Sequence, residues 1–331
     1  MKQKIGPGDI DSISRRLIFI ITMLLIVMMA ARTPMDSDVW WHLRSGQVTV
    51  ESGKPLTMDV FSYTRENQDW VNHSWLAQVL LFGANQFGSY TGLALWVVVL
   101  AVVSLTLVYL QLKGAAWWRS LLVILAAVAI APVWSPRPQM ISLAFLAGLS
   151  WLTKKWREGE LRGLWTLPIL FLIWSNFHGG YSLGFLLLVG FLVGQVVDHF
   201  LGNKVQVLPW QELKVILIWS IMAFLAVAIN PNGVKMWTIP FETVGVDSLQ
   251  QYIQEWASPD FHDPTQQPIL VLIFLLIGSL GLSGLRVSAV EWLTCGGFLL
   301  LALMSRRNIA PFALISLPLI SVHGWAVLEA G

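Results

Sequence analysis

Long runs of apolar residues, separated by short polar segments, dominate the chain from about residue 15 to its end. A helix needs about 20 apolar residues to cross a bilayer, and fewer where its polar ends reach the interface. The pattern therefore predicts about ten membrane-spanning helices, some of them short. These lie near residues 15–33, 91–112, 120–134, 140–153, 163–176, 183–199, 215–230, 269–284, 289–304 and 309–327.

Two further helices are predicted in the polar stretch that follows the first span. Residues 39–50 form a short helix at the membrane interface, with Trp40 and Trp41 as its anchors. Residues 75–82 are too few to span a bilayer and form a second interfacial or re-entrant helix. The segment Gly88–Gly92 then turns the chain into the next span.

Composition favours the same class of protein. Of the 331 residues, 56% are hydrophobic and 12% are charged, whereas a soluble domain carries about 25% charged residues. We interpret residues 1–331 as one all-α, polytopic transmembrane domain. The net charge of +2 gives no case for binding nucleic acid. The single cysteine, Cys295, excludes an intramolecular disulfide and a cysteine-rich metal site.

Lysine and arginine are unevenly divided between the two sides of the predicted bundle. With a cytoplasmic N-terminus, 13 of the 21 basic residues fall on the inner side, although the outer loops are longer. We therefore predict an integral membrane protein with a cytoplasmic N-terminus, with a cleaved signal peptide as the alternative for the first apolar run. The inner residues are Lys2, Lys4, Arg15, Arg16, Lys113, Arg119, Lys154, Lys155, Arg157, Arg162, Lys204, Lys214 and Arg286.

The predicted outer side gathers the polar chemistry. It holds two long loops, about 34–90 and 231–268, and short polar corners at 135–139, 176–180 and 305–308. Four of the six histidines fall there. A scaffold protein has no need of this asymmetry, so we expect the functional site on this side.

Asp36 and Asp38 open the first long outer loop. In extended or turn geometry, this spacing lets both carboxylates approach one cation or one hydroxyl. Either one is a general base, or both help to hold a divalent metal such as Mg²⁺ or Mn²⁺. The alternative is that Asp36 caps the helix that follows. His42 and Arg44 continue the same stretch and are expected to contact substrate.

Three arginines in the short corners are candidates for phosphate binding. Arg137 stands between Pro136 and Pro138, and a rigidly held guanidinium suits a bidentate phosphate contact. Snorkelling to lipid headgroups is the alternative for Arg137. Arg306 and Arg307 offer a second clamp at the end of a different span.

Two further histidines complete the candidate site. His178 precedes Gly179 and Gly180, and the two glycines permit close approach of a backbone. Its imidazole either binds substrate or metal, or is held by packing alone. His73 is a further substrate-binding candidate. The metal-ligand candidates are Asp36, Asp38, His73 and His178.

An aspartate-bearing first outer loop, then interfacial helices, then many spans with polar outer corners, resembles the GT-C superfamily of integral-membrane glycosyltransferases. The local resemblance is carried by Asp36–Gly46, Asp59–Tyr63 and Trp70–Trp75. The resemblance implies a protein of the bacterial inner (plasma) membrane. It also implies inverting transfer of a sugar from a polyprenyl-phosphate-linked donor to an acceptor at the outer face of that membrane.

The resemblance also implies roles for particular residues. Asp36 or Asp38 would deprotonate the acceptor hydroxyl, and Arg137 with Arg306 or Arg307 would stabilise the leaving phosphate. The expected partners are the lipid-linked donor and membrane lipids. The alternatives are a non-catalytic protein that binds or transports polyprenyl lipids and an assembly subunit of a membrane complex.

Overall fold

Every predicted apolar segment overlaps a helix in the computed structural model, which describes residues 7–33, 35–203 and 206–331. These residues form no β-strand beyond a single bridge between Met58 and Asp69. The all-α prediction is confirmed. The α-helices are α1 Pro7–Ala30, α2 Asp38–Ser52, α3 Trp75–Tyr109, α4 Ala116–Ile130, α5 Gln139–Arg157, α6 Thr166–Phe177, α7 Tyr181–Phe200, α8 Trp210–Ala226, α9 Ile239–Val244, α10 Asp247–Tyr252, α11 Pro268–Leu282, α12 Ala289–Met304 and α13 Ile309–Ala330.

Five helices of the described chain are long and apolar enough to cross a membrane. Helices α6, α11 and α12 are apolar but shorter. An integral membrane protein is therefore the class that the helices support, while the crossing of the remaining helices stays a prediction. The five are Asp11–Ala30, Trp75–Tyr109, Ala116–Val133, Tyr181–Phe200 and Arg306–Ala330.

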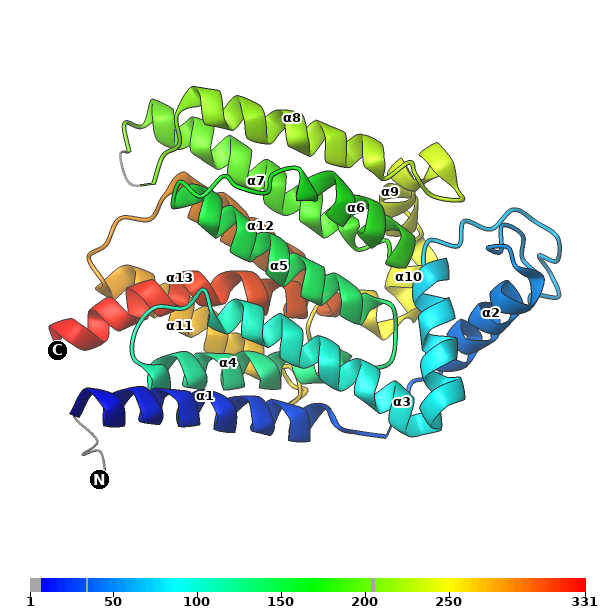
Figure 1. The fold of residues 1–331 in the computed structure, drawn as a ribbon, viewed down its shortest axis with the longest axis horizontal. Helices are drawn as coiled ribbons and strands as arrows, with labels where there is room; N and C mark the ends of the chain where they lie inside the picture. The colour runs from blue at the N-terminus through cyan, green and yellow to red at the C-terminus, as the bar shows by residue number, and fades with distance from the viewer. Residues whose placement is uncertain (1–6, 34, 204–205) are drawn as a thin grey trace, which may run out of the picture.

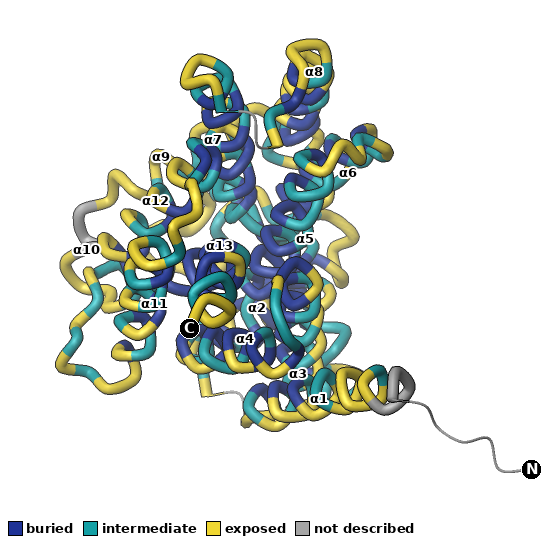
Figure 2. Tube along the Cα trace, turned by 90° about the vertical axis from the view of Figure 1, so that its left-hand side faces the viewer, coloured by how far each residue is buried: buried dark blue, intermediate teal, exposed yellow. Residues whose placement is uncertain are grey.

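Helix α13 forms the centre of the bundle. It is apolar on all sides, which is the pattern of a helix surrounded by others. It packs against α4, α11 and α12, and its side chains Phe312, Leu317 and Ile320 are fully buried. Figure 2 shows the buried residues concentrated on α13 and on the neighbouring faces of α4 and α5. Helices α1 and α8 lie at the edges of the bundle in Figure 1.

The connections between helices gather at two ends of the bundle (Figure 1). One end, called here the site end, carries α2, the start of α3, the α4–α5 corner, the α6–α7 turn and the segment 227–267. The opposite end carries the α3–α4, α5–α6, α7–α8 and α11–α12 connections. The basic residues predicted to lie inside gather toward this opposite end, although Lys2, Lys4 and Lys204 lie outside the described residues.

Helix α2 and the first arm of α3 form a separate corner at the site end. Helix α2 ends at Gly53, whose φ of 67° is the left-handed conformation that glycine adopts at helix C-termini. Helix α3 breaks at Ser89 (φ 49°, ψ −134°), inside the predicted turn. Its first arm therefore stands across the bundle while its second arm runs along it (Figure 1). The predicted helix at 75–82 is this first arm.

The second long outer loop is more ordered than the sequence suggested. The apolar pattern predicts no helix in 231–268, but this loop contains α9, α10 and two short 3₁₀ helices at Gly233–Trp237 and Gln254–Trp256. Tertiary contacts hold it to the bundle, because Met236 is fully buried and its carbonyl accepts a hydrogen bond from the Tyr181 hydroxyl. Such short helices carry too few residues for a clear hydrophobic period.

Gly46 is where α2 and the first arm of α3 touch. A methyl group there would overlap the backbone carbonyl of Gln78 and lie 2.9 Å from the Phe82 Cβ. Gly46→Ala is therefore expected to destabilise the protein by about 1–3 kcal/mol, the usual cost of overpacking. Gly83→Ala is the matched control, since Gly83 lies on the same arm with open space around its Cβ. Thermal unfolding in detergent measures both, and equal melting temperatures would contradict this packing.

Candidate functional site

Arg137 is the centre of an ion cluster at the site end. Its guanidinium lies 3.0 Å from an Asp38 oxygen, 3.1 Å from a Glu255 oxygen and 3.5 Å from an Asp36 oxygen. The corner that holds it is stiffened by the flanking prolines and by a hydrogen bond from the Arg137 amide to the Ser135 carbonyl. The arginine joins both long outer loops to the start of α5.

These partners differ from the phosphate that the sequence suggested for Arg137. Glu255, Asp36 and Asp38 raise the pKa of the guanidinium although its burial opposes this, and only 18% of its side chain is exposed. With three carboxylates around it, its positive charge is already balanced within the chain. Arg137 therefore organises the carboxylates of the site. Glu255 was not among the predicted site residues, although it stands in a polar stretch of the second outer loop.

Asp36 and Asp38 have different environments. Asp36 accepts a hydrogen bond from the Asp38 backbone amide at 2.9 Å, which forms a turn just before α2. It is not the predicted cap, because the N-cap position is Ser37, which makes no side-chain cap hydrogen bond. The Asp38 carboxylate makes no backbone hydrogen bond in the described structure, and 43% of its side chain is exposed. Burial raises its pKa against the lowering effect of Arg137, and the negative charges of Asp36 and Glu255 add to the rise.

His42 lies beneath the ion cluster as a neutral group. The Asn72 side-chain amide donates to the Gln78 Oε1 at 2.8 Å, which turns the Gln78 amide nitrogen toward the Nδ1 of His42, 3.4 Å away. Nδ1 then accepts and Nε2 carries the proton. Burial, with the charge of Arg137 and the nearby His73, lowers the pKa of His42 to about 3.

His178 is held in the same tautomer by different neighbours. Its Nδ1 accepts from the Gly180 amide at 3.0 Å and lies 2.7 Å from the Ser142 hydroxyl. The Trp174 indole donates to that hydroxyl, so the hydroxyl hydrogen is free to face Nδ1. Burial first, and then the charges of neighbouring groups including His73 and Arg307, lower the pKa of His178 well below its usual range.

His73 completes a row of three imidazoles. Its ring centroid lies 5.9 Å from that of His178, and burial lowers its pKa. A Cβ at Gly179 would lie 3.2 Å from the His73 ring, so the glycine permits this approach, as the sequence suggested. His42, His73 and His178 therefore form a layer of neutral donors under the charged cluster.

Arg306 and Arg307 do not act as a pair. Arg306 braces the second outer loop, because its amide donates to the Ala257 carbonyl and its Nε to the Ser258 carbonyl. The Arg307 guanidinium stacks over the Trp256 ring at 4.2 Å and forms no ion pair in the described chain. Arg307 is thus an arginine of the site whose charge has no ion-pair partner in the described chain.

Some predicted residues are not brought into the site. Arg44 lies on the exposed side of α2, two residues beyond buried His42. His262, one of the four histidines of the predicted outer side, is fully exposed, and in the described chain its ring bonds its neighbour Asp260. Among the described residues, no group of three or more His, Cys, Asp or Glu side chains is arranged to hold a metal ion. The four metal-ligand candidates, Asp36, Asp38, His73 and His178, therefore form no such group in the described chain.

An apolar groove of about 590 Å³ runs between α3, α5 and α6. Two of its lining residues, Ile141 and Phe177, are the chain neighbours of Ser142 and His178. From there the groove follows α5 as far as Trp151 and Leu152. At the site end, the groove therefore reaches the chain neighbours of Ser142 and His178, and none of the three histidines is among its lining residues.

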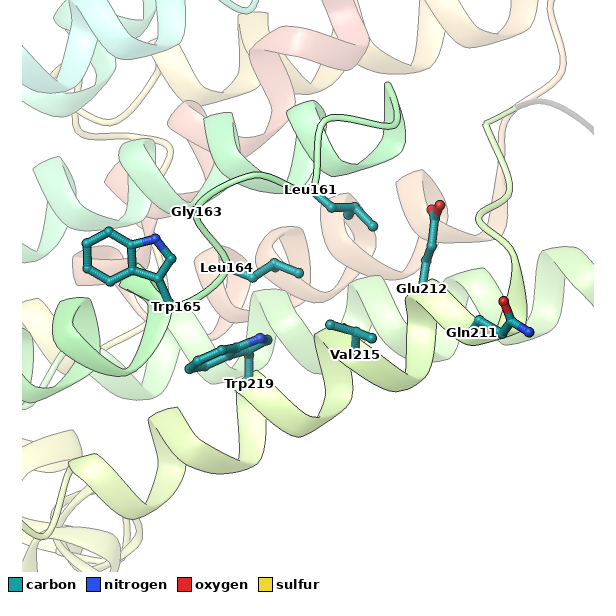
Figure 3. A pocket seen from close by; sticks show the side chains of 8 residues that line it. All are labelled: Leu161, Gly163, Leu164, Trp165, Gln211, Glu212, Val215 and Trp219. Atoms are coloured by element: carbon teal, nitrogen blue, oxygen red, sulfur yellow. The ribbon is translucent and has the colours of Figure 1, made fainter.

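A second groove lies away from the ionisable cluster (Figure 3). It has a volume of about 380 Å³ and is bordered by Trp165 before α6 and by Glu212 and Trp219 on α8. These residues are mostly apolar, and the groove is open to the surroundings. Its two tryptophans fit the interfacial aromatic belt, and none of the predicted site residues lines it.

Removal of the Arg137 charge tests the ion cluster. Arg137→Gln is expected to reduce the free energy of unfolding by about 3 kcal/mol, the lower part of the range for unpaired buried charge, because the carboxylates are partly exposed. Adding Asp38→Asn should recover part of this loss. Arg306→Gln, with the same charge change but only a carbonyl partner, is the control. Failure of Asp38→Asn to recover stability would show that Arg137 acts by packing alone.

The histidine layer predicts a dependence of stability on pH. Below pH 6.5 the unfolded chain protonates His42, whereas the folded protein, with a pKa of about 3, does not. Stability should therefore fall as pH is lowered from 6.5, by at most about 1.4 kcal/mol per pH unit for this residue. His42→Asn should make the fall shallower, with a remaining slope from His73 and His178. Melting temperatures between pH 7.5 and 5 test this; identical slopes would contradict it.

Comparisons with protein-family models, with curated proteins and with solved structures found no match to this chain. Its function is therefore argued from the residues of the site.

Proposed function

We propose that the chain is an integral-membrane glycosyltransferase of the GT-C type. It transfers a sugar from a polyprenyl-phosphate-linked donor to an acceptor at the outer face of the membrane. The observation that carries this proposal is that a partly exposed carboxylate, Asp38, and an arginine without an ion pair in the described chain, Arg307, both lie near Arg137 and Glu255. An apolar groove that starts at the chain neighbour of His178 supports it.

Asp38 is the general base in this proposal. The acceptor hydroxyl attacks the anomeric carbon of the donor sugar, the bond from that carbon to the phosphate oxygen breaks, and Asp38 takes the hydroxyl proton. A carboxylate with a raised pKa is a better proton acceptor at neutral pH than an ordinary one. Asp36 is less suited to this role, because it already binds the start of α2.

Arg307 binds the leaving phosphate. Negative charge develops on that phosphate as the sugar departs, and a cation in a partly desolvated place stabilises it more strongly than one in water. Stacking on Trp256 holds the guanidinium in position. The Nε2–H groups of His42 and His178 supply neutral donors for the phosphate or for sugar hydroxyls.

The apolar groove between α3, α5 and α6 holds the lipid tail of the donor. It begins beside His178 and is lined by Trp96, Phe145 and Leu152 among other apolar residues. In this arrangement all ten predicted spans cross a bacterial inner membrane, the N-terminus is cytoplasmic and the site end faces outward. The groove then holds the tail of the donor, and the histidines and Arg307 contact its phosphate.

A non-catalytic protein that binds or transports polyprenyl lipids is the second candidate. It is favoured by the ion pairs of Asp36 and Asp38 with Arg137, which give both aspartates a structural purpose. Such a protein keeps Arg307 and the groove but has no use for a base. Loss of Asp38 therefore separates the two candidates.

Purified protein incubated with a panel of polyprenyl-phosphate sugars should release polyprenyl phosphate. Asp38→Asn should reduce this release at least about 100-fold, the lower limit for loss of a general base, without lowering the melting temperature. Arg307→Gln should also reduce it strongly, whereas Arg306→Gln should keep most of it. Donor binding without any release by the wild type would favour the second candidate, and normal release by Asp38→Asn would refute the proposed mechanism.

A further inference from the structure

A polar cavity lies at the opposite end of the bundle from the candidate site. It has a volume of about 180 Å³ and lies between the C-terminal ends of α3 and α5, the first turns of α12 and the later half of α13. Its wall changes from apolar residues such as Phe191 and Leu319 to charged ones. Nothing in the proposed transfer reaction uses it.

Three cationic side chains from two separate segments line this cavity: Lys113, Lys154 and Arg157. Arg157 is largely buried and uses its two terminal nitrogens on Glu291, at 3.3 Å, and on the Ser288 hydroxyl, at 3.1 Å. Its Nε is shielded from solvent and has no hydrogen-bond partner in the described chain. An unpaired buried donor of this kind is unfavourable.

The two lysines carry charge that the chain only partly balances. The Lys154 ammonium donates to the Gln111 carbonyl at 2.8 Å. Its nearest carboxylate, Glu158, is 3.9 Å away and lies closer to Lys155, at 3.4 Å. The Lys113 ammonium forms no ion pair in the described residues. Burial and the like charge of Lys113 lower the pKa of Lys154 although Glu158 opposes this.

The carboxylates that face the cavity do not remove its positive character. Glu291 is engaged by Arg157 and by the Ser288 amide and hydroxyl at the start of α12. Glu158 is shared between Lys154 and Lys155. The amide of Gln111 and the hydroxyl of Ser150 bond one another at 2.9 Å and form a neutral wall. What remains unmatched in the described residues is Lys113, together with the N–H groups of Lys154 and of the Arg157 terminal nitrogens that these contacts do not use.

We propose that this cavity binds a phosphate group. A polyvalent oxyanion has enough acceptors to meet donors from three side chains at once, whereas a monovalent carboxylate would meet fewer. The phosphate comes either from the headgroup of an anionic lipid or from soluble phosphate on this side of the membrane. The inference is independent of the proposed glycosyl transfer, which takes place at the site end.

Calorimetric titration of the full chain in a maltoside detergent tests the proposal. The probes are inorganic phosphate and dihexanoyl phosphatidic acid, each matched in ionic strength with sodium chloride. At least one of them should bind, and both Lys113→Gln and Lys154→Gln should weaken that binding at least about 10-fold. Lys155→Gln is the matched control, because Lys155 neighbours Lys154 on α5 but does not line the cavity.

The outcomes are distinguishable. Binding of inorganic phosphate indicates a soluble ligand, and binding of phosphatidic acid alone indicates a lipid headgroup. Lys113→Gln keeps the result interpretable if Lys154→Gln fails to fold, because the Lys113 side chain is exposed and has no ion-pair partner to disrupt. Absence of binding by the wild type, or equal weakening in Lys155→Gln, would overturn the proposal.

Discussion

The pairing of Arg137 with carboxylates is the constraint on which the site depends. A guanidinium that is mostly removed from water must be compensated by negative charge, and here that charge comes from Asp36, Asp38 and Glu255. These residues belong to two loops that are more than 200 positions apart in sequence. Because Glu255 precedes Trp256, the same contact brings the stacked Arg307 to the site. The ion cluster thus turns two separate loops into one surface.

Arg137 and Arg307 have different roles because they have different partners. Arg137 and Arg307 have the same chemistry, but Arg137 is neutralised within the chain and Arg307 rests on an aromatic ring. A guanidinium that is stacked on an aromatic ring keeps the N–H groups at its own edge available to an anion. Beneath them, the imidazoles of His42 and His178 remain neutral because burial lowers their pKa. The charged groups are therefore the arginines and carboxylates of the site, and the neighbouring imidazoles are neutral hydrogen-bond donors.

The sequence predicted the helices well and the site only in part. Apolar runs determine helices regardless of their neighbours, so all ten segments and the helix 39–50 were found, and the break at Ser89 falls in the predicted turn. The meeting of Asp36 and Asp38 with Arg137 depends on tertiary structure, as does the role of Glu255, and no local pattern carries it. The relay from Asn72 through Gln78 to His42 left no signal in the sequence. Arg44 was predicted to belong to the site because it is close to His42 in the chain. On a helix, however, residues two positions apart do not face each other.

Acidic residues at both ends of the bundle bind nearby backbone amides, and the carboxylates that do not are the candidates for proton transfer. At the opposite end Asp198 accepts amide hydrogens of Ala289 and Val290, and Glu291 closes a capping box with Ser288, so these carboxylates stabilise the start of α12. Several site-end acids are likewise committed to nearby backbone amides, as Asp36, Asp59, Asp260 and Asp263 are. Asp38 and Glu255 are not: in the described structure their carboxylates contact Arg137 rather than local backbone. Asp38 and Glu255 are partly exposed, and each is paired with one arginine. They are therefore available for proton transfer, and Asp38 is the more exposed of the two.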